Sequence, residues 1–396
     1  MGLLLLFDGP SKQALTLSGN EITDASRAAG LEGDGLLNDS SFGIWEAATN
    51  LCTNGGFETN TTGWIAWKPE ASISRVTTQS KFGSASLEVV VTDLGSRGAR
   101  VTVSLSATTV YTFSAWVKVP TGATVRIAVY DTTTTTELGG VNVVGDDDWQ
   151  HASVTFTSDG DGGTHNFFIM TYADYNAVTF YVDGVQIEAQ PVATPYIETD
   201  GGTATRSAAR VQAPASLLDE TQGWVAMRFR PGWGAATEMG GGTEYPHLFY
   251  WADDANNFID FIYAENTNAL GGGRKAGGVG DGYYAVRTLT QGVPFTVIVA
   301  WTATTVGYAF DGGAFGTAAN TSIPTLSAAT FDIFNKAGTL QFNGDVIWFA
   351  CGTGTLTNAD SATIHAFGNG DRGLEAFPGN PTGFWSANTN IMEVQP

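Results

Sequence analysis

The sequence has little positive charge. Lysine and arginine together number 18, against 39 aspartate and glutamate residues, which gives a formal net charge of −21 and a pI near 4.3. Nucleic acids and anionic membrane surfaces attract proteins through clustered basic side chains. This balance therefore argues against either as a partner. Charge of either sign is also sparse, at 14 % of residues against about 25 % in an average soluble domain.

Cysteine and long apolar runs are scarce too. The two cysteines, Cys52 and Cys351, stand far apart in the sequence, and no CxxC pair is present. A cysteine zinc site or a redox dithiol therefore has no support. We expect the two cysteines to be unpaired, and a disulfide between them is the less favoured alternative. The apolar start, residues 3–7, is far shorter than the roughly 20 residues of a membrane helix. It also lacks the basic region and cleavage site of a signal peptide. We expect a soluble protein made in a cytoplasm, with residues 3–7 as a short buried strand.

Glycine and aromatic residues, by contrast, are abundant. The chain has 50 glycines among 396 residues, and 12 % of its residues are aromatic. Disordered acidic chains are poor in aromatic residues, so this composition indicates folded strands joined by glycine turns. At roughly 150 residues per domain, the length allows two or three domains.

Short alternating apolar runs separated by turn residues continue along most of the chain, without amphipathic helices between them. This pattern predicts an all-β protein with two β-sandwich (jelly-roll) domains in series. A short helix is predicted over 356–368, with Asn358 as its cap. The expected organisation is an N-terminal docking segment at 1–50, sandwiches at 51–190 and 213–370, a connector at 191–212 and an extended tail at 371–396.

Two resemblances support these domains. The segments NLCTNGGFETNTTGW (50–64), YTFSAWVKV (111–119), DWQHASVTFT (148–157) and FYVDGVQIE (180–188) resemble, in order and spacing, the jelly-roll carbohydrate-binding modules of bacterial glycanases. The segments WTATTVGYAFDGG (301–313) and FNKAGTLQFNGDVIWFACGTGTLTNADSATIHAF (334–367) resemble the concanavalin-like, laminin-G-type sandwich of lectins and adhesins. Both resemblances imply sugar-binding folds.

The linking segments carry a third resemblance. SRAAGLEGDGLLNDSSFGIWEAATNLCTNGGFE (26–58) and ATPYIETDGGTATRSAARV (193–211) are similar to structural proteins of tailed bacteriophages. This resemblance implies a virion protein made in the host cytoplasm, in the tail rather than the head. Its implied partners are other virion proteins, host cell-surface polysaccharide and further copies of the chain, with a trimer as the first expectation.

Sugar binding relies on aromatic faces that stack against pyranose rings and on polar groups that bond hydroxyls. Candidate aromatic residues stand among polar or turn residues, and burial is the alternative for each. The candidates are Trp64, Trp67, Tyr130, Tyr172 and Tyr175 in the first sandwich and Trp233, Tyr245, Tyr283 and Tyr284 in the glycine-rich loops of the second. Their expected polar partners are Asn60, Asp131, Asp174 and Asn176, whereas Trp116 and Trp149 are assigned to the core. Trp67 and Tyr175 are the favoured candidates.

Two acidic turns are candidates for a structural calcium ion. GDDDW (145–149) and DGDGG (159–163) offer the carboxylate and carbonyl oxygens that Ca²⁺ prefers. Asp159 and Asp161 are the proposed ligands, although no glutamate follows at the EF-hand spacing, and a plain solvated turn is the alternative. No other cofactor is expected.

Catalytic motifs are missing from the sequence. No Glu-x-Asp-x-x-Glu string of a concanavalin-like glycanase occurs, nor a GxSxG or HExxH motif. We therefore expect a non-enzymatic glycan-binding protein of the virion. The alternatives are a capsid decoration or head-fibre protein, a pure structural spacer and, least favoured, a polysaccharide-degrading enzyme.

Overall fold

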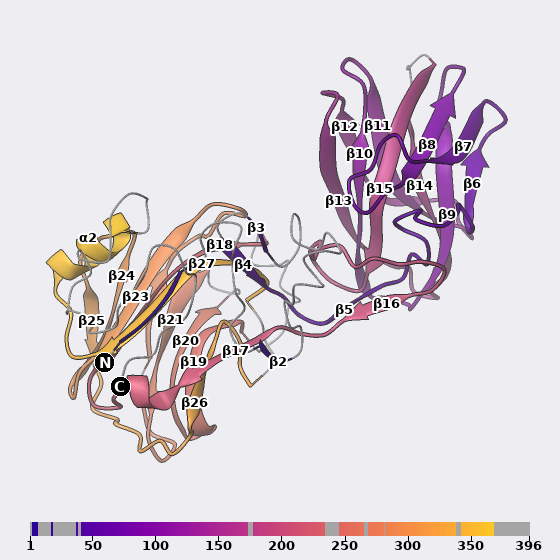
Figure 1. Cartoon of the computed structure of the whole chain (residues 1–396). Coiled ribbons are helices and arrows are strands. Elements are labelled where there is room, and N and C mark those ends of the chain that lie inside the picture. The colour runs from indigo at the N-terminus through magenta and orange to yellow at the C-terminus, as the bar shows by residue number, and fades with distance from the viewer. Residues whose placement is uncertain are drawn as a thin grey trace. The chain divides into compact units, whose positions relative to one another are not determined.

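The computed structural model describes residues 2–6, 17–18, 37–38, 41–172, 177–233, 245–264, 268–280, 282–337 and 342–367. Strands dominate these residues, and the predicted all-β class is confirmed (Figure 1). The chain divides into two compact units. One, here called the first sandwich, includes the described residues of 47–206; the other, the second sandwich, includes the described residues up to Glu46 and from Ser207 onward.

Two five-stranded antiparallel sheets form the main body of the first sandwich. The β10 sheet has the order β13-β10-β15-β8-β7 and the β11 sheet has the order β12-β11-β14-β9-β6. The strands of the β10 sheet are β7 (Ala71–Val76), β8 (Ser86–Val91), β10 (Val110–Lys118), β13 (Trp149–Thr157) and β15 (Val178–Glu188). Those of the β11 sheet are β6 (Trp64–Trp67), β9 (Gly98–Leu105), β11 (Thr124–Asp131), β12 (Glu137–Val144) and β14 (Gly163–Thr171).

The core of the first sandwich follows from strand alternation. Successive side chains of a strand point to opposite faces, so Phe113 of β10 and Phe167 of β14 both face inward. They meet edge to face with ring centroids 5.2 Å apart, and neither is exposed. Burying one such side chain stabilises the fold by roughly 1.5–3 kcal/mol.

The core assignment of Trp116 and Trp149 was wrong. Trp116 follows the inward-facing Ala115 and therefore lies on the outer face of the β10 sheet, where it is partly buried. Lys81 Nζ lies 4.0 Å from its ring centroid and the His151 ring 5.1 Å away. Trp149, at the start of β13, is also partly buried and outside the core cluster.

The second sandwich pairs an eight-stranded sheet with a seven-stranded one. The first has the order β25-β24-β23-β18-β27-β4-β3, with β1 also paired to β27, and the second has the order β2-β17-β26-β19-β20-β21-β22. The strands of the larger sheet are β1 (Gly2–Leu6), β3 (Leu37–Asn38), β4 (Ser41–Ile44), β18 (Gly223–Pro231), β23 (Phe295–Trp301), β24 (Thr305–Phe310), β25 (Gly316–Ala319) and β27 (Gly344–Thr353). Those of the smaller sheet are β2 (Leu17–Ser18), β17 (Arg210–Pro214), β19 (His247–Asp254), β20 (Asn257–Ala264), β21 (Ala269–Lys275), β22 (Gly282–Val286) and β26 (Thr330–Ile333).

The start of the chain belongs to the second sandwich. β1 and β4 both pair with β27, and β2 pairs with β17. The described strands of residues 2–44 therefore extend these two sheets instead of forming a separate docking segment. A five-residue apolar strand is too short for a core of its own, but it can complete the edge of a larger sheet. The first sandwich is thus inserted in the chain between strands of the second.

The first and last strands of the inserted first sandwich pair with each other. β5 (Ala48–Asn50) and β16 (Ala204–Arg206) form a two-stranded antiparallel sheet within the first sandwich. The expected connector, 191–212, contains β16 and the start of β17. Cys52 and Cys351 are both buried, and no disulfide joins them.

The predicted short helix is confirmed as α2 (Asn358–Phe367), but its cap is different. The Thr357 and Asp360 side chains bond each other's backbone N–H groups, with Thr357 N–H donating to Asp360 Oδ2 at 2.6 Å. Thr357 is therefore the N-cap, while Asn358 Oδ1 accepts a hydrogen bond from Phe315 N–H. Ile364 packs α2 onto the larger sheet.

Among the helices that the structure describes, none combines the length and apolar character of a membrane span. The tail, 371–396, lies outside the described residues.

Candidate functional site

The strands of the β11 sheet are labelled in Figure 1. Their register places three rows of side chains on the outer face of the sheet. Residues directly opposite each other on paired strands share a face, so the rows can be followed across β6, β9, β14, β11 and β12. The first row is Trp67, Gly98, Met170, Arg126 and Asn142; the second is Ile65, Arg100, Phe168, Ala128 and Gly140; the third is Thr102, Asn166, Tyr130 and Glu137. We call these rows the aromatic face.

Aromatic rings meet at the centre of this face. The Phe168 ring is contacted by Trp67, with centroids 5.0 Å apart at 67°, and by Tyr130, with centroids 5.4 Å apart at 87°. Phe168, Met170 and Ala128 form a buried apolar cluster separate from the sandwich core. An antiparallel sheet that packs on one side normally has a polar outer face. A second apolar cluster there indicates a surface built for contact.

Cationic side chains border Trp67. The Arg100 guanidinium carbon lies 5.1 Å from the Trp67 ring centroid and 5.9 Å from that of Phe168. Lys68 Nζ lies 4.7 Å from the Trp67 ring centroid. These contacts hold the indole in one orientation, which lowers the entropic cost of stacking a ligand on it.

A chain of polar contacts lies beside the rings. The Tyr130 hydroxyl donates to Glu137 Oε2 at 2.5 Å, Arg126 forms an ion pair with the other carboxylate oxygen, and Arg126 Nη1 donates to Asn142 Oδ1 at 2.7 Å. A β-carbon at Gly140 would lie 2.7 Å from Arg126 Nη2, so the glycine leaves room for the ion pair. The Arg126 guanidinium also lies 4.9 Å from the ring centroid of Tyr172.

The pKa values of Tyr130 and Glu137 are shifted in opposite directions. Burial, then the hydrogen bond to Glu137 and its charge, raises the pKa of Tyr130 to about 12. Burial alone would raise the pKa of Glu137, but the hydrogen bonds from Tyr130 and Arg126 outweigh it and the pKa is lowered. At neutral pH the face therefore presents a fixed carboxylate acceptor beside fixed donors.

A Glu137→Gln variant tests this coupling. Because the charge and hydrogen bond of Glu137 both raise the pKa of Tyr130, we expect that pKa to fall below about 12 in the variant while burial keeps it above that of free tyrosine. NMR titration of the Tyr130 ring carbon would measure the change. An unchanged titration midpoint would contradict the assigned contact.

The structure removes Trp64 from the candidates. Trp64 and Trp67 are three residues apart in β6, so their side chains lie on opposite faces. Trp64 is only 5 % exposed, its Nε1 donates to the Asn54 carbonyl at 2.9 Å and its ring packs 5.3 Å from that of Phe57. It is a core residue with no face free for a sugar.

The second-sandwich candidates differ in burial. Trp233 is fully buried and its Nε1 donates to the Phe342 carbonyl, so it too is a core residue. Tyr283 stacks on the buried Tyr308 with centroids 5.3 Å apart. Tyr284 is 53 % exposed, and Tyr245 is partly buried. Burial, then the charges of Asp260 and Tyr245, raises the pKa of Tyr284.

The remaining predicted residues differ in where the structure places them. Tyr172 is 39 % exposed and contacts the aromatic face through Arg126. Asn60 accepts from Thr62 N–H within its own turn, and Asp131 is buried at the end of β11. Asp161 is exposed, whereas Asp159 is partly buried. The predicted residues Asp174, Tyr175 and Asn176 lie outside the described residues.

Sequence reasoning missed several members of the face. They are Arg100, Arg126, Glu137, Phe168 and Met170. One signal could have identified two of them: in the run NFFIMT of β14, apolar residues occupy both alternating sets, so both faces of that strand are covered.

Comparisons with known proteins agree with this location. Residues 49–174 match a family model described as a carbohydrate binding domain. This match covers β6 to β14 of the first sandwich and includes the whole aromatic face. Over these residues the first sandwich is therefore similar to a carbohydrate binding domain. No curated protein sequence matches the chain at a significant level.

Solved structures with similarity include several binding modules. The C-terminal family 22 carbohydrate-binding module of Clostridium thermocellum xylanase 10B is 22 % identical, and the match covers 38 % of this chain and 97 % of that one, with a TM-score of 0.31. A second module of family 16 is 23 % identical over 35 % of this chain and 99 % of that one, with a TM-score of 0.29. The enzymatically active domain of bacteriophage CBA120 tailspike protein 4 is 13 % identical over 35 % of this chain and 21 % of that one, with a TM-score of 0.28.

Proposed function

We propose that the aromatic face binds a polysaccharide without cleaving it. The observation that carries this proposal is the juxtaposition of Trp67, Phe168 and Tyr130 with the polar chain of Glu137 and Arg126. Aromatic rings suit the apolar C–H faces of pyranoses, and an oriented carboxylate and guanidinium suit their hydroxyls. The family match of residues 49–174 supports the same assignment.

The charge state of the face favours binding over hydrolysis. Glycoside hydrolysis by the common mechanism needs two carboxyl groups, one of which has a raised pKa and donates a proton. The three rows of the aromatic face contain a single carboxylate, Glu137, whose pKa is lowered. Glu137 is therefore suited to accept hydrogen bonds from sugar hydroxyls and unsuited to act as a general acid.

The test is binding to a panel of soluble and insoluble polysaccharides, including xylan, β-glucan, galactan and bacterial wall glycans. Affinity electrophoresis and pull-down of the full chain would measure retention, and reducing ends would be followed in the same tubes. We expect retention on at least one glycan without release of reducing sugar. Release of reducing sugar would replace the binding proposal with an enzymatic one, and no retention on any glycan would remove it.

We further propose that the chain is a structural component of a bacteriophage virion, in the tail rather than the head. The resemblance of the segments 26–58 and 193–211 to phage structural proteins supports this placement. A millimolar sugar site is worth only about −4 kcal/mol, and several copies on one particle raise the apparent affinity. Repetition in a homotrimer, among other virion proteins, would therefore give firm attachment to a host surface.

Particle composition and subunit number test the virion proposal. Mass spectrometry of purified particles should detect the chain, and light scattering should give the mass of a trimer. Absence from particles would remove the virion assignment and leave the glycan-binding proposal intact. Presence in tailless heads would instead favour the capsid decoration alternative.

A further inference from the structure

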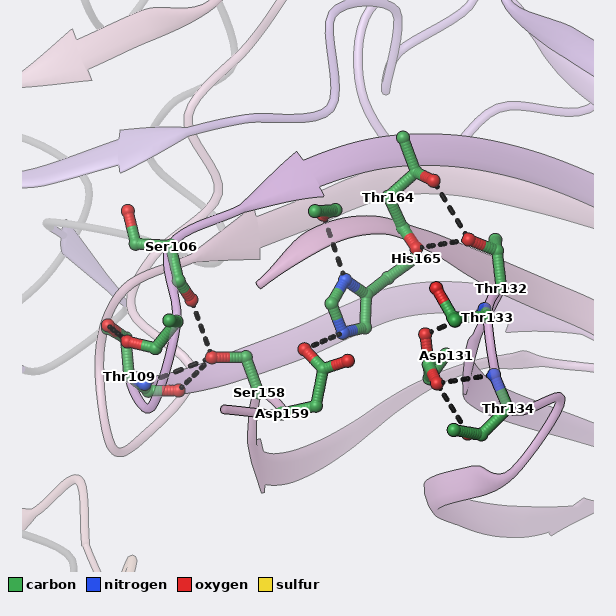
Figure 2. Close-up of polar contacts among 12 residues, drawn as sticks. Ser106, Thr109, Asp131, Thr132, Thr133, Thr134, Ser158, Asp159, Thr164 and His165 are labelled. Atoms are coloured by element: carbon green, nitrogen blue, oxygen red, sulfur yellow. Dashed lines mark hydrogen bonds and ion pairs between the residues drawn. The ribbon is translucent and has the colours of Figure 1, made fainter. Parts of the chain in front are cut away.

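Three side chains with metal-ligating atoms converge at one end of the β11 sheet, on its inner side. Asp131 ends β11, His165 lies directly opposite it in β14, and Asp159 lies in the turn between β13 and β14 (Figure 2). One ligand atom of each lies within 4.8 Å of those of the other two. The site is separate from the aromatic face, whose residues occupy the other side of the sheet.

The hydrogen bonding of His165 fixes the direction of its free lone pair. His165 is fully buried, and its Nδ1 lies 3.1 Å from the Gly163 carbonyl oxygen. A carbonyl can only accept, so Nδ1 carries the proton, and in the neutral ring Nε2 presents a lone pair. Metal-ligating histidines in proteins are commonly anchored through the second ring nitrogen in this way.

The lone pair of Nε2 is directed at a carboxylate. His165 Nε2 lies 3.5 Å from Asp159 Oδ1, and neither of these buried atoms has a hydrogen-bond partner. Two acceptors that face each other away from water repel unless a proton on the ring or a metal cation lies between them. Two ligands about 2.1 Å from a tetrahedral ion stand about 3.4 Å apart, close to the observed separation.

Asp131 supplies a second carboxylate to the cluster. It is 2 % exposed and accepts hydrogen bonds from the hydroxyl and N–H of Thr134 and from the N–H of Thr133. These bonds hold the Asp131 carboxylate in one orientation. One of its oxygen atoms lies within 4.8 Å of a ligand atom of Asp159 and of His165.

We propose that Asp131, Asp159 and His165 bind one divalent transition-metal ion, with zinc as the best match. Imidazole with carboxylates is a ligand set for zinc and its neighbours, whereas Ca²⁺ and Mg²⁺ take oxygen ligands. The Asp159 side chain is 20 % exposed, so an ion can enter from solvent and keep a water ligand. The sequence predicted a Ca²⁺ ion bound by Asp159 and Asp161. The site proposed here takes zinc instead, and its ligands besides Asp159 are Asp131 and His165 and not Asp161.

The test uses the full chain after tag removal and chelator treatment. We expect calorimetric titration with ZnCl₂ to show one site per chain, and Zn²⁺ to raise the unfolding midpoint of the first sandwich. Asp159→Asn, at a partly exposed position, should weaken zinc binding by at least about tenfold. His165→Phe removes the ligand with an apolar ring of similar size and should abolish binding.

Matched controls separate this site from other zinc-binding side chains. His151→Gln and Asp148→Asn change exposed residues of the first sandwich outside the cluster and should leave zinc affinity within twofold. His247→Gln removes a histidine that lies 3.7 Å from Asp260 in the second sandwich and should also have no effect. The proposal is overturned if the chain binds no stoichiometric zinc, if binding survives Asp159→Asn unchanged, or if it depends on His247. Preference for Ca²⁺ over Zn²⁺ would overturn the choice of metal. No outcome depends on glycan binding.

Discussion

Replacing Trp67 with alanine should weaken polysaccharide binding by about 30- to 100-fold, which matches the loss of a central aromatic anchor worth about 2 kcal/mol or more. Trp67 is an outward-facing ring of the first row and contacts Phe168 edge to face. Its removal would also leave the Arg100 guanidinium with only its longer contact to the Phe168 ring, at 5.9 Å. Affinity electrophoresis in gels containing the retained polysaccharide would measure the change.

Trp116→Ala is the matched control for this prediction. Trp116 is also a partly buried, outward-facing tryptophan with a cation over its ring, but it lies on the outer face of the opposite β10 sheet. The same substitution there should leave glycan affinity unchanged. Equal losses in the two variants would point to general destabilisation, and a loss confined to Trp116→Ala would move the binding surface to the β10 sheet.

Replacing Phe113 with alanine should lower the free energy of unfolding of the first sandwich by about 3–5 kcal/mol, because the variant loses buried apolar surface and leaves a cavity. Phe113 is fully buried and contacts Phe167 of the opposite sheet, so a single change weakens the packing between both layers. Urea unfolding followed by circular dichroism and tryptophan fluorescence would measure the shift.

Two further variants show which unfolding transition belongs to which sandwich. Val144 is 67 % exposed, so Val144→Ala should change stability by less than about 0.5 kcal/mol. Phe249 is buried in the second sandwich, so Phe249→Ala should shift the transition of that unit. The prediction fails if Phe113→Ala and Val144→Ala have the same unfolding midpoint.

Alternation along single strands explains what could be predicted from the sequence. Apolar and polar residues alternate with a period of two within a single strand sequence, so the all-β class and most of the strands can be predicted from it. The same rule shows that Trp64 and Trp67 cannot share a face, although it does not say which of them points inward. That choice depends on the opposite sheet. For Trp116 the alternation along β10 was assigned to the wrong face, because Phe113, Ala115 and Val117 are the residues that point into the core.

Contacts between strands account for what could not be predicted. Arg126 and Glu137 meet across a hairpin whose register shifts between Val129 and Tyr130. A shift of one residue reverses the face on which every later side chain lies, so the polar chain of the aromatic face cannot be read from spacing. Asp131 and His165 likewise meet only because β11 pairs with β14.

The insertion of the first sandwich between strands of the second has a consequence for biosynthesis. β1 and β4 pair with β27, which begins at Gly344, about 300 residues later in the chain. At about 5–20 residues per second of translation, those early strands leave the ribosome roughly 15–60 s before their partner exists. The first sandwich has all its strands by then and can fold during synthesis. The first sandwich can therefore fold before the second, although strands of the second sandwich are synthesised first. Until β27 is made, the unpaired β1 and β4 are the strands of the nascent chain most exposed to misassembly.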